Sequence, residues 1–134
     1  MPTSTYTFGS ALRLPVHEAR PLVEAALKAE GFGILTEIDV AATMQAKLGI
    51  DHAPYLILGA CNPALAHRAL QADPSLGALL PCNVVIRDDD GRTIVEAMDP
   101  RVVMDLVENP EVAAVADEAE ARLRRVIASL GAGG

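Results

Sequence analysis

The sequence predicts an α+β fold: a two-layer sandwich in which helices pack on one face of a mainly antiparallel sheet. Several short segments have the apolar patterns of β-strands, and longer segments have the apolar spacing of amphipathic helices. Two of the strand segments flank an Asp-Gly turn, which predicts a hairpin and therefore antiparallel pairing. A chain of 134 residues is expected to form one domain, with its core between about residues 3 and 130.

The first part of the chain is expected to alternate strands and helices. A strand over residues 3–12 precedes a helix over 16–30, whose apolar residues form one stripe. A second strand over 33–39 alternates in polarity, and a short helix over 40–48 stops at a glycine. Pro21 fits the first helix best if it lies in the first turn, where backbone amides have no partner within the helix.

The middle of the chain contains the most apolar strand. Residues 54–60 are mostly apolar, which is typical of an interior strand. Asn62 followed by Pro63 predicts a helix start, because a capping side chain precedes a proline at the first helical position. That helix is expected to end near Ala72, and a loop or a single helical turn continues to Leu80.

The last part of the chain contains the hairpin and a long helix. Strands over residues 81–87 and 92–98 are joined by the Asp-Gly turn. A short helical segment follows, and Pro110 then begins a helix with a continuous apolar stripe. The glycine-rich tail over 131–134 is expected to be flexible.

Composition and charge exclude several classes of function. The hydrophobic fraction of 51% argues against disorder, and the net charge of −7 argues against a nucleic-acid partner because it repels phosphate. No apolar run reaches the ~20 residues of a membrane span, so no membrane partner is expected. The N-terminal residues do not resemble a secretion signal, and the two cysteines indicate free thiols in a reducing, cytoplasmic compartment.

The motifs of the common small enzymes are absent from the sequence. It contains no dinucleotide-binding glycine motif, phosphate loop, hydrolase nucleophile elbow or His-Glu-x-x-His sequence. It also lacks a Cys-x-x-Cys pair, which argues against a thioredoxin-type redox centre and a closed zinc site. No cofactor and no metal site are therefore predicted.

Two cysteines and a histidine form the strongest candidate site. Cys61 ends the interior strand beside a helix start, a position that lowers the pKa of a thiol. His67 lies about one turn further along that helix, and Cys82 opens the next strand. If the two strands are antiparallel neighbours, Cys61, Asn62, His67, Cys82 and Asn83 converge at one edge of the sheet. If the strands are parallel, the two thiols lie at opposite edges.

Three functional hypotheses follow from this cluster. The first is a module that binds a small molecule or a partner at the edge formed by the five residues. The second is a thiol-dependent enzyme or sulfur carrier, with Cys61 as nucleophile and His67 as its base or ion-pair partner. The third is a self-associating structural protein that uses the apolar face of the sheet. Against the first two stands the ordinary role of free cysteines, which is to fill buried space.

A soft-metal site is the least favoured interpretation of the two thiols, because their spacing matches no zinc pattern. The remaining polar residues that we considered are interpreted as solvated or turn residues rather than as sites: His17, His52, the pair Glu37 and Asp39, the Asp88-Asp89-Asp90 turn, and Arg122, Arg124 and Arg125.

Several segments together resemble one bacterial and archaeal family, known as domain of unknown function 302. They are Gly31 to Asp39, Leu58-Gly59-Ala60-Cys61-Asn62-Pro63, Ala66-His67-Arg68-Ala69-Leu70, Leu79-Leu80-Pro81-Cys82-Asn83-Val84-Val85 and Met98-Asp99-Pro100. The resemblance covers about Tyr6 to Leu130. It implies an α+β fold laid out like the TATA-binding protein, and it implies a homodimer. It implies no established reaction, cofactor or catalytic residue.

Overall fold

The computed structural model describes residues 4–133 and has the predicted α+β architecture. The strands are β1 (Thr7–Leu12), β2 (Gly33–Asp39), β3 (Tyr55–Cys61), β4 (Cys82–Asp89) and β5 (Arg92–Met98). The helices are α1 (Val16–Ala29), α2 (Val40–Leu48), α3 (Pro63–Ala72), the 3-10 helix η1 (Pro74–Leu79), α4 (Arg101–Leu106) and α5 (Pro110–Gly133).

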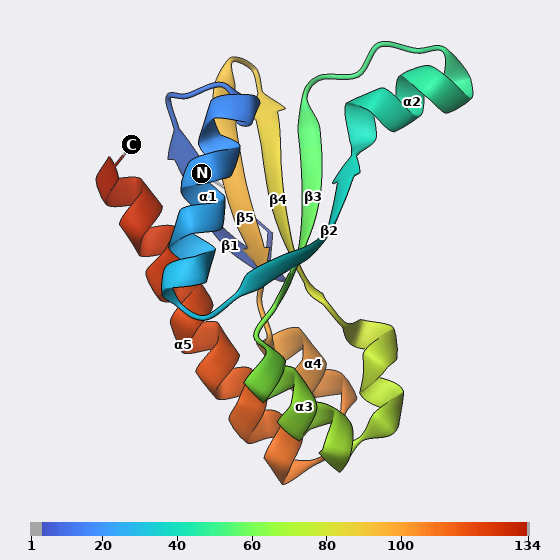
Figure 1. Ribbon diagram of the computed structural model, residues 1–134, viewed down its shortest axis with the longest axis vertical. Coiled ribbons are helices and arrows are strands. Elements are labelled where there is room, and N and C mark those ends of the chain that lie inside the picture. The colour runs from blue at the N-terminus through green and yellow to red at the C-terminus, as the bar shows by residue number, and fades with distance from the viewer. Residues whose placement is uncertain (1–3, 134) are drawn as a thin grey trace.

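The strands form one five-stranded sheet in the order β1-β5-β4-β3-β2, and every neighbouring pair is antiparallel (Figure 1). The predicted hairpin joins β4 to β5. Both residues of its turn, Asp90 and Gly91, have positive φ angles, of 57° and 89°. A two-residue hairpin turn of this handedness requires such angles, which explains the Asp-Gly pair.

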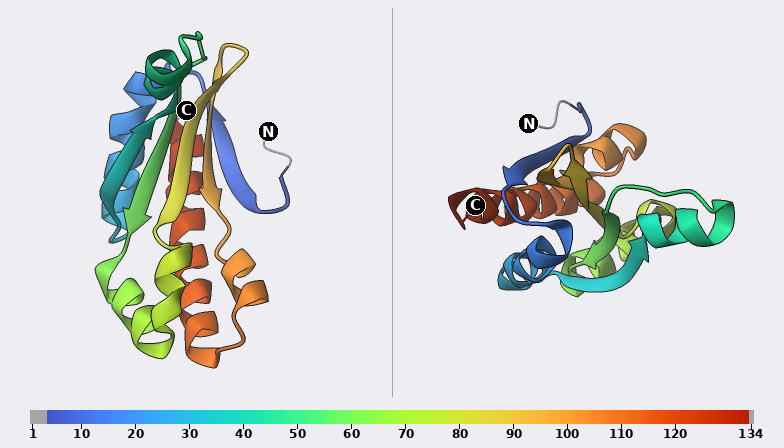
Figure 2. Two further views of the ribbon diagram at one scale, coloured as in Figure 1. Left: turned by 90° about the vertical axis from the view of Figure 1, so that its right-hand side faces the viewer. Right: turned by 90° about the horizontal axis from the view of Figure 1, so that it is seen from above.

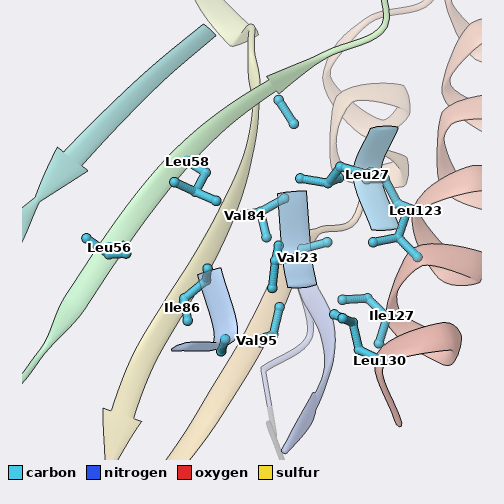
Figure 3. Close-up of a cluster of buried hydrophobic side chains, with 14 of the residues drawn as sticks. Val23, Leu27, Leu56, Leu58, Val84, Ile86, Val95, Leu123, Ile127 and Leu130 are labelled. Carbon is cyan, nitrogen blue, oxygen red and sulfur yellow. The ribbon is translucent and has the colours of Figure 1, made fainter. Parts of the chain in front are cut away.

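One face of the sheet is covered by α1 and α5, and the main hydrophobic core lies between them and the strands (Figures 2 and 3). Alternate strand residues point toward the helices, as the period of two requires. The inward-facing residues include Leu56 and Leu58 of β3, Val84 and Ile86 of β4, and Val95 of β5. Among the residues that the structure describes, no helix combines the length and the apolar character needed to cross a bilayer.

The remaining helices do not lie on that face, so the expected two-layer arrangement is only part of the fold. Helices α3 and α4 and the first half of α5 extend beyond the strand ends, on the side where β3 and β5 end and β4 begins (Figure 1). A second hydrophobic cluster holds this helical end together: Leu65, Ala69, Leu76, Val112, Val115 and Ala119. Helix α2 projects from the opposite end of the molecule, and none of its residues is buried.

Three local predictions differ from the structure. Pro21 lies in the sixth position of α1, beyond the first turn. His17, whose carbonyl would pair with residue 21, is exposed, so water can replace the missing backbone bond. Helix α5 continues to Gly133, into the predicted flexible tail over 131–134, and Gly134 lies outside the described residues. Strand β1 begins at Thr7, and residue 3 also lies outside the described part of the chain.

Candidate functional site

Three neighbouring strands bring sulfur-containing residues to the same edge of the sheet. Cys61 is the last residue of β3, Cys82 is the first of β4, and Met98 is the last of β5. In the β3–β4 pair Ala60 lies opposite Cys82, so the two cysteines are one register step apart. The antiparallel pairing of β3 and β4 therefore places both cysteine residues at the same end of the two strands.

A pocket opens between this edge and the helical end of the molecule. Its volume is about 60 Å³, and it lies among the ends of β3, β4 and β5 and helices α3, η1 and α5. Alanines make up much of its wall: Ala60, Ala66, Ala69, Ala116 and Ala119. Because alanine has the smallest side chain after glycine, the elements approach closely while space remains between them. Nearly all of the exposed lining is apolar, so an unpaired charge inside the pocket would be costly.

Both cysteines line the pocket as free, partly exposed thiols. Burial raises the pKa of the Cys61 thiol above its ordinary value. Burial, with a smaller contribution from neighbouring Cys61, raises the pKa of Cys82 to about 11. Both thiols are therefore protonated and uncharged at neutral pH.

The expected lowering of the Cys61 pKa by the adjacent helix start is wrong, and the cap explains why. The side-chain oxygen of Asn62 accepts a hydrogen bond from the backbone nitrogen of Leu65 at 3.2 Å. Pro63, in the first helical position, has no N–H to offer. Two of the first amide positions of α3 therefore offer no donor to Cys61, and desolvation by burial is the cause that raises the pKa of its thiol.

Asn62 lines the pocket, but its side-chain amide makes contacts that hold neighbouring elements together. Its oxygen caps α3, and its nitrogen faces Gly31, where it lies 2.9 Å from the position that a Cβ atom would occupy. Gly31 has a φ angle of 86°. A side chain there would therefore be disfavoured by the backbone conformation and by its close approach to the Asn62 nitrogen. The contact between Asn62 and Gly31 therefore joins the start of α3 to the loop before β2.

The other two predicted site residues, His67 and Asn83, do not line the pocket. On α3 the buried residues are Leu65 and Ala69. His67 lies two positions from each, about 200° around the helix, and is exposed. Asn83 lies between Cys82 and Val84 and so points to the opposite face of the sheet. The structure therefore brings together Cys61, Asn62 and Cys82.

Sequence reasoning missed Met98 as a pocket residue. Asp89 lies opposite Arg92 and Val84 lies opposite Ala97, so the hairpin places Met98 at the same end of the sheet as Cys82. Met98 lines the pocket because it packs against the cluster of the helical end, which the hairpin turn does not determine. The alanine wall had no comparable signal, because alanines are frequent throughout the chain and their convergence depends on helix packing.

The remaining polar residues have structural roles. The Glu37 carboxylate pairs with Arg20 at 2.6 Å, and Asp39 caps α2 through the backbone nitrogen of Ala42 at 2.9 Å. Neither contact resembles a general acid–base pair. Within residues 4–133, the His, Cys, Asp and Glu side chains form no group of three that could hold a metal ion.

Comparisons with known proteins agree with the predicted resemblance. Residues 8–130 match the sequence family described as "Domain of unknown function DUF302". The fold is similar to the crystal structure of an uncharacterized conserved DUF302 protein from Bacillus stearothermophilus, with a TM-score of 0.85 and 29% sequence identity. That similarity covers 92% of this chain and 97% of the other chain. No curated protein matches the sequence. The family match spans most of the chain and includes both cysteine segments, and the chain therefore belongs to the DUF302 family.

Proposed function

We propose that this chain is a binding module that takes up a small ligand in the pocket at the sheet edge. The observation that carries the proposal is an unfilled space of about 60 Å³ in a wall of small apolar side chains. Small-molecule sites are commonly concave and mostly apolar, with few polar groups. The ligand is an uncharged group, or an ion whose charge is neutralised on binding.

Binding is better supported than thiol catalysis. The described residues that line the pocket include no Asp, Glu, His, Lys or Arg that could serve as a general base. The pKa of Cys61 is raised, whereas an activated nucleophile requires a lowered one. His67 is exposed and outside the lining, so its pairing with Cys61 has no support from the geometry.

The proposal can be tested with small apolar probes and one pocket-filling variant. Isobutanol and benzene, titrated separately, should shift the backbone NMR signals of α3, the first half of α5 and the strand ends around Cys61. Ala66→Leu should abolish these shifts, because Ala66 is a partly exposed residue of the pocket wall. Circular dichroism should show that the variant remains folded.

Ala26→Leu is the matched control for this experiment. Ala26 is also a partly exposed helical alanine packed against a hydrophobic cluster, but it lies on α1, away from the pocket. This variant should bind the probes as the wild type does. Probe-induced shifts that persist unchanged in Ala66→Leu, or that are spread over the whole surface, would contradict the proposal.

Self-association is a second candidate function, supported by the arm formed by β2, α2 and the segment up to Ile50. Strand β2 is an edge strand, and the helix that follows it has no buried residue. Four large apolar side chains of the arm are exposed: Leu35 (67%), Ile38 (49%), Leu48 (65%) and Ile50 (48%). Pairing of two β2 edges around a twofold axis would cover the same residues on both copies.

Analytical ultracentrifugation of two charge variants distinguishes this arrangement from non-specific association. Leu48→Lys should convert a dimer to a monomer. Leu106→Lys is the matched control, because Leu106 also ends a short helix and is exposed to nearly the same extent, 66%. A wild-type chain that is monomeric at micromolar concentrations, or a dimer unaffected by Leu48→Lys, would exclude the arm as the contact.

A further inference from the structure

Two helices border the pocket with lining residues at the same spacing. On α3 the lining runs from Asn62 to Ala69, and on α5 it runs from Val112 to Ala119. In both helices the lining residues follow the first by three, four and seven positions, so they share one face. Seven residues of α-helix span about 10 Å, so each lining face extends along two turns.

Helices α3 and α5 lie side by side in opposite directions along this length (Figure 1). At one end Asn109, which precedes α5, donates a hydrogen bond from its side-chain nitrogen to the carbonyl oxygen of Ala72 at 3.3 Å. At the other end the side chains of Asn62 and Arg122 both approach Gly31, at 2.9 and 3.2 Å from the position that a Cβ atom would occupy. The two lining faces therefore border the same space over about 10 Å.

The pocket is narrow for this length. Its volume is about 60 Å³. A methylene group is close in size to a water molecule, and one water needs about 10–15 Å³ of such space, so about four to six methylenes fit in the pocket. An aliphatic cavity that holds benzene in another protein measures about 150 Å³. The dimensions therefore suit a hydrocarbon chain better than a ring.

The lining has a closed end and an open end. Leu76 and Val112, on the side remote from the sheet, are buried and belong to the cluster of the helical end. Cys61 and Pro81, beside the strand ends, are partly exposed. A chain that enters from the strand ends would therefore bury its far end against Leu76 and Val112.

We infer that the pocket takes the end of a straight, saturated alkyl chain, methyl group first, and leaves the polar end of the ligand at the strand ends. The inference rests on the proposed function, because it names the class of ligand taken up by the same pocket. The lining residues that the structure describes include no aromatic ring and no charged side chain, and the oxygen of Asn62 is engaged by the α3 cap. A saturated chain suits this wall because it has no polar group that would need a hydrogen-bond partner.

Titration of the wild-type chain with straight 1-alkanols, from ethanol to 1-octanol, tests this inference by NMR. Affinity should rise about three- to fourfold with each added methylene, because each one buried removes the same apolar area from water. The rise should level off at about four to six carbons, because further methylenes remain in the solvent.

Cyclohexanol and 1-hexanol form a matched pair of ligands, because both contain six carbons and one hydroxyl group. The ring should bind at least about fivefold more weakly, since its greater width overpacks the space between the two helices. Intermolecular nuclear Overhauser effects in the wild type provide the orientation without any variant. The terminal methyl group of 1-hexanol should contact the methyl groups of Leu76 and Val112, and the carbon bearing the hydroxyl should contact Pro81.

Val112→Ala should change the preferred chain length. The substitution removes two carbons from the closed end, so the affinity should level off about one or two carbons later in the alkanol series. Val126→Ala is the matched control, because Val126 lies on the same helix and is equally buried, at 1%, but belongs to the cluster under the sheet. It should leave the preferred chain length unchanged.

Three results would overturn the inference: affinity that does not depend on chain length, equal binding of cyclohexanol and 1-hexanol, or a terminal methyl group that contacts Pro81 instead of the closed end. If one of these is found while isobutanol or benzene binds and is excluded by Ala66→Leu, the pocket is a ligand site of another class and only the alkyl-chain assignment falls. If neither the probes nor the alkanols bind, both proposals fail together.

Discussion

At the scale of single residues, Cys82 links the pocket to the pH dependence of folding. Its pKa is about 11 in the folded chain and 9.0 in an unperturbed thiol. The folded state therefore holds the thiol proton more tightly than the unfolded state does. This contribution to stability is present in full below about pH 9 and is lost as the pH rises toward 11.

Cys82→Ala should remove this pH dependence. In urea unfolding between pH 8 and 11, the wild type should lose up to about 3 kcal/mol more of its free energy of unfolding than the variant does. The measurement is the difference between the two chains across the series, so the titration of other groups cancels. Parallel pH profiles for the two chains would show that the Cys82 thiol is not desolvated.

Gly59 marks the tightest contact beside the pocket. A Cβ atom there would lie 2.2 Å from the Thr36 hydroxyl oxygen and 2.7 Å from the ring of Pro81. The hydroxyl can rotate away, but the proline ring cannot, and Pro81 is itself part of the pocket wall. The absence of a side chain at Gly59 therefore lets β3 approach Pro81 closely.

Gly59→Ala should lower the free energy of unfolding by at least about 2 kcal/mol through overpacking. Gly33→Ala is the matched control on the neighbouring strand, because nothing lies within 4 Å of the added methyl group. That change should stay within about 0.5 kcal/mol. Chemical denaturation measures both, and equal effects of the two substitutions would refute the close contact.

At the scale of elements, Pro21 is the clearest local conflict between sequence and structure. It lies inside α1, where it removes one backbone hydrogen bond at an exposed position. Pro21→Ala should stabilise the chain by about 1–2 kcal/mol, since the cost of a proline inside a helix exceeds the entropy that it removes from the unfolded chain.

Pro110→Ala, at the first position of α5, is the control for this substitution. An amide at that position would have no partner within the helix, so no helical bond is gained and the variant should be neutral or slightly less stable. Thermal unfolding measures both changes. Destabilisation by Pro21→Ala would mean that the rigid ring stabilises α1 in some other way.

The elements themselves could be predicted wherever local signals were strong. The Asp90-Gly91 turn determined the hairpin, and Asn62 before Pro63 determined the start of α3, because these signals act over a few bonds. The full length of α5 could not be predicted. The glycine-rich sequence 131–134 indicated a flexible tail, whereas the helix continues to Gly133, and Gly131 lies beside Ser10 of β1.

The same distinction explains how much of the candidate site was predicted. Cys61 and Cys82 were placed together correctly, because antiparallel pairing fixes where strand ends meet. His67 was misplaced relative to the pocket, because its position depends on which side of α3 faces α5. The alanine wall depends on contacts between helices distant in sequence, which local patterns do not encode.

At the scale of the whole molecule, α5 joins the two hydrophobic clusters. Leu123, Val126 and Ile127 belong to the cluster under the sheet, and Val112 and Val115 belong to the cluster around the pocket. One continuous helix contributes to both, so neither cluster can lose its packing without disturbing the other.

The chain should therefore unfold in a single transition, with equal calorimetric and van't Hoff enthalpies. Leu123→Ala and Val112→Ala, one in each cluster, should both lower the temperature of that same transition, by several degrees for each kcal/mol lost. Scanning calorimetry makes the measurement. Two resolved peaks, with each variant shifting only one, would show that the clusters are independent.

The alanine-walled pocket places thermostability and ligand uptake in opposition. Larger aliphatic residues at those positions would bury more surface and raise the melting temperature, since filled cavities are a common route to stabilisation. Each such replacement would also occupy the volume in which we propose that a ligand is held. Engineering or selection for heat resistance alone would therefore be expected to fill this pocket. Variants with higher melting temperatures should bind the ligand more weakly.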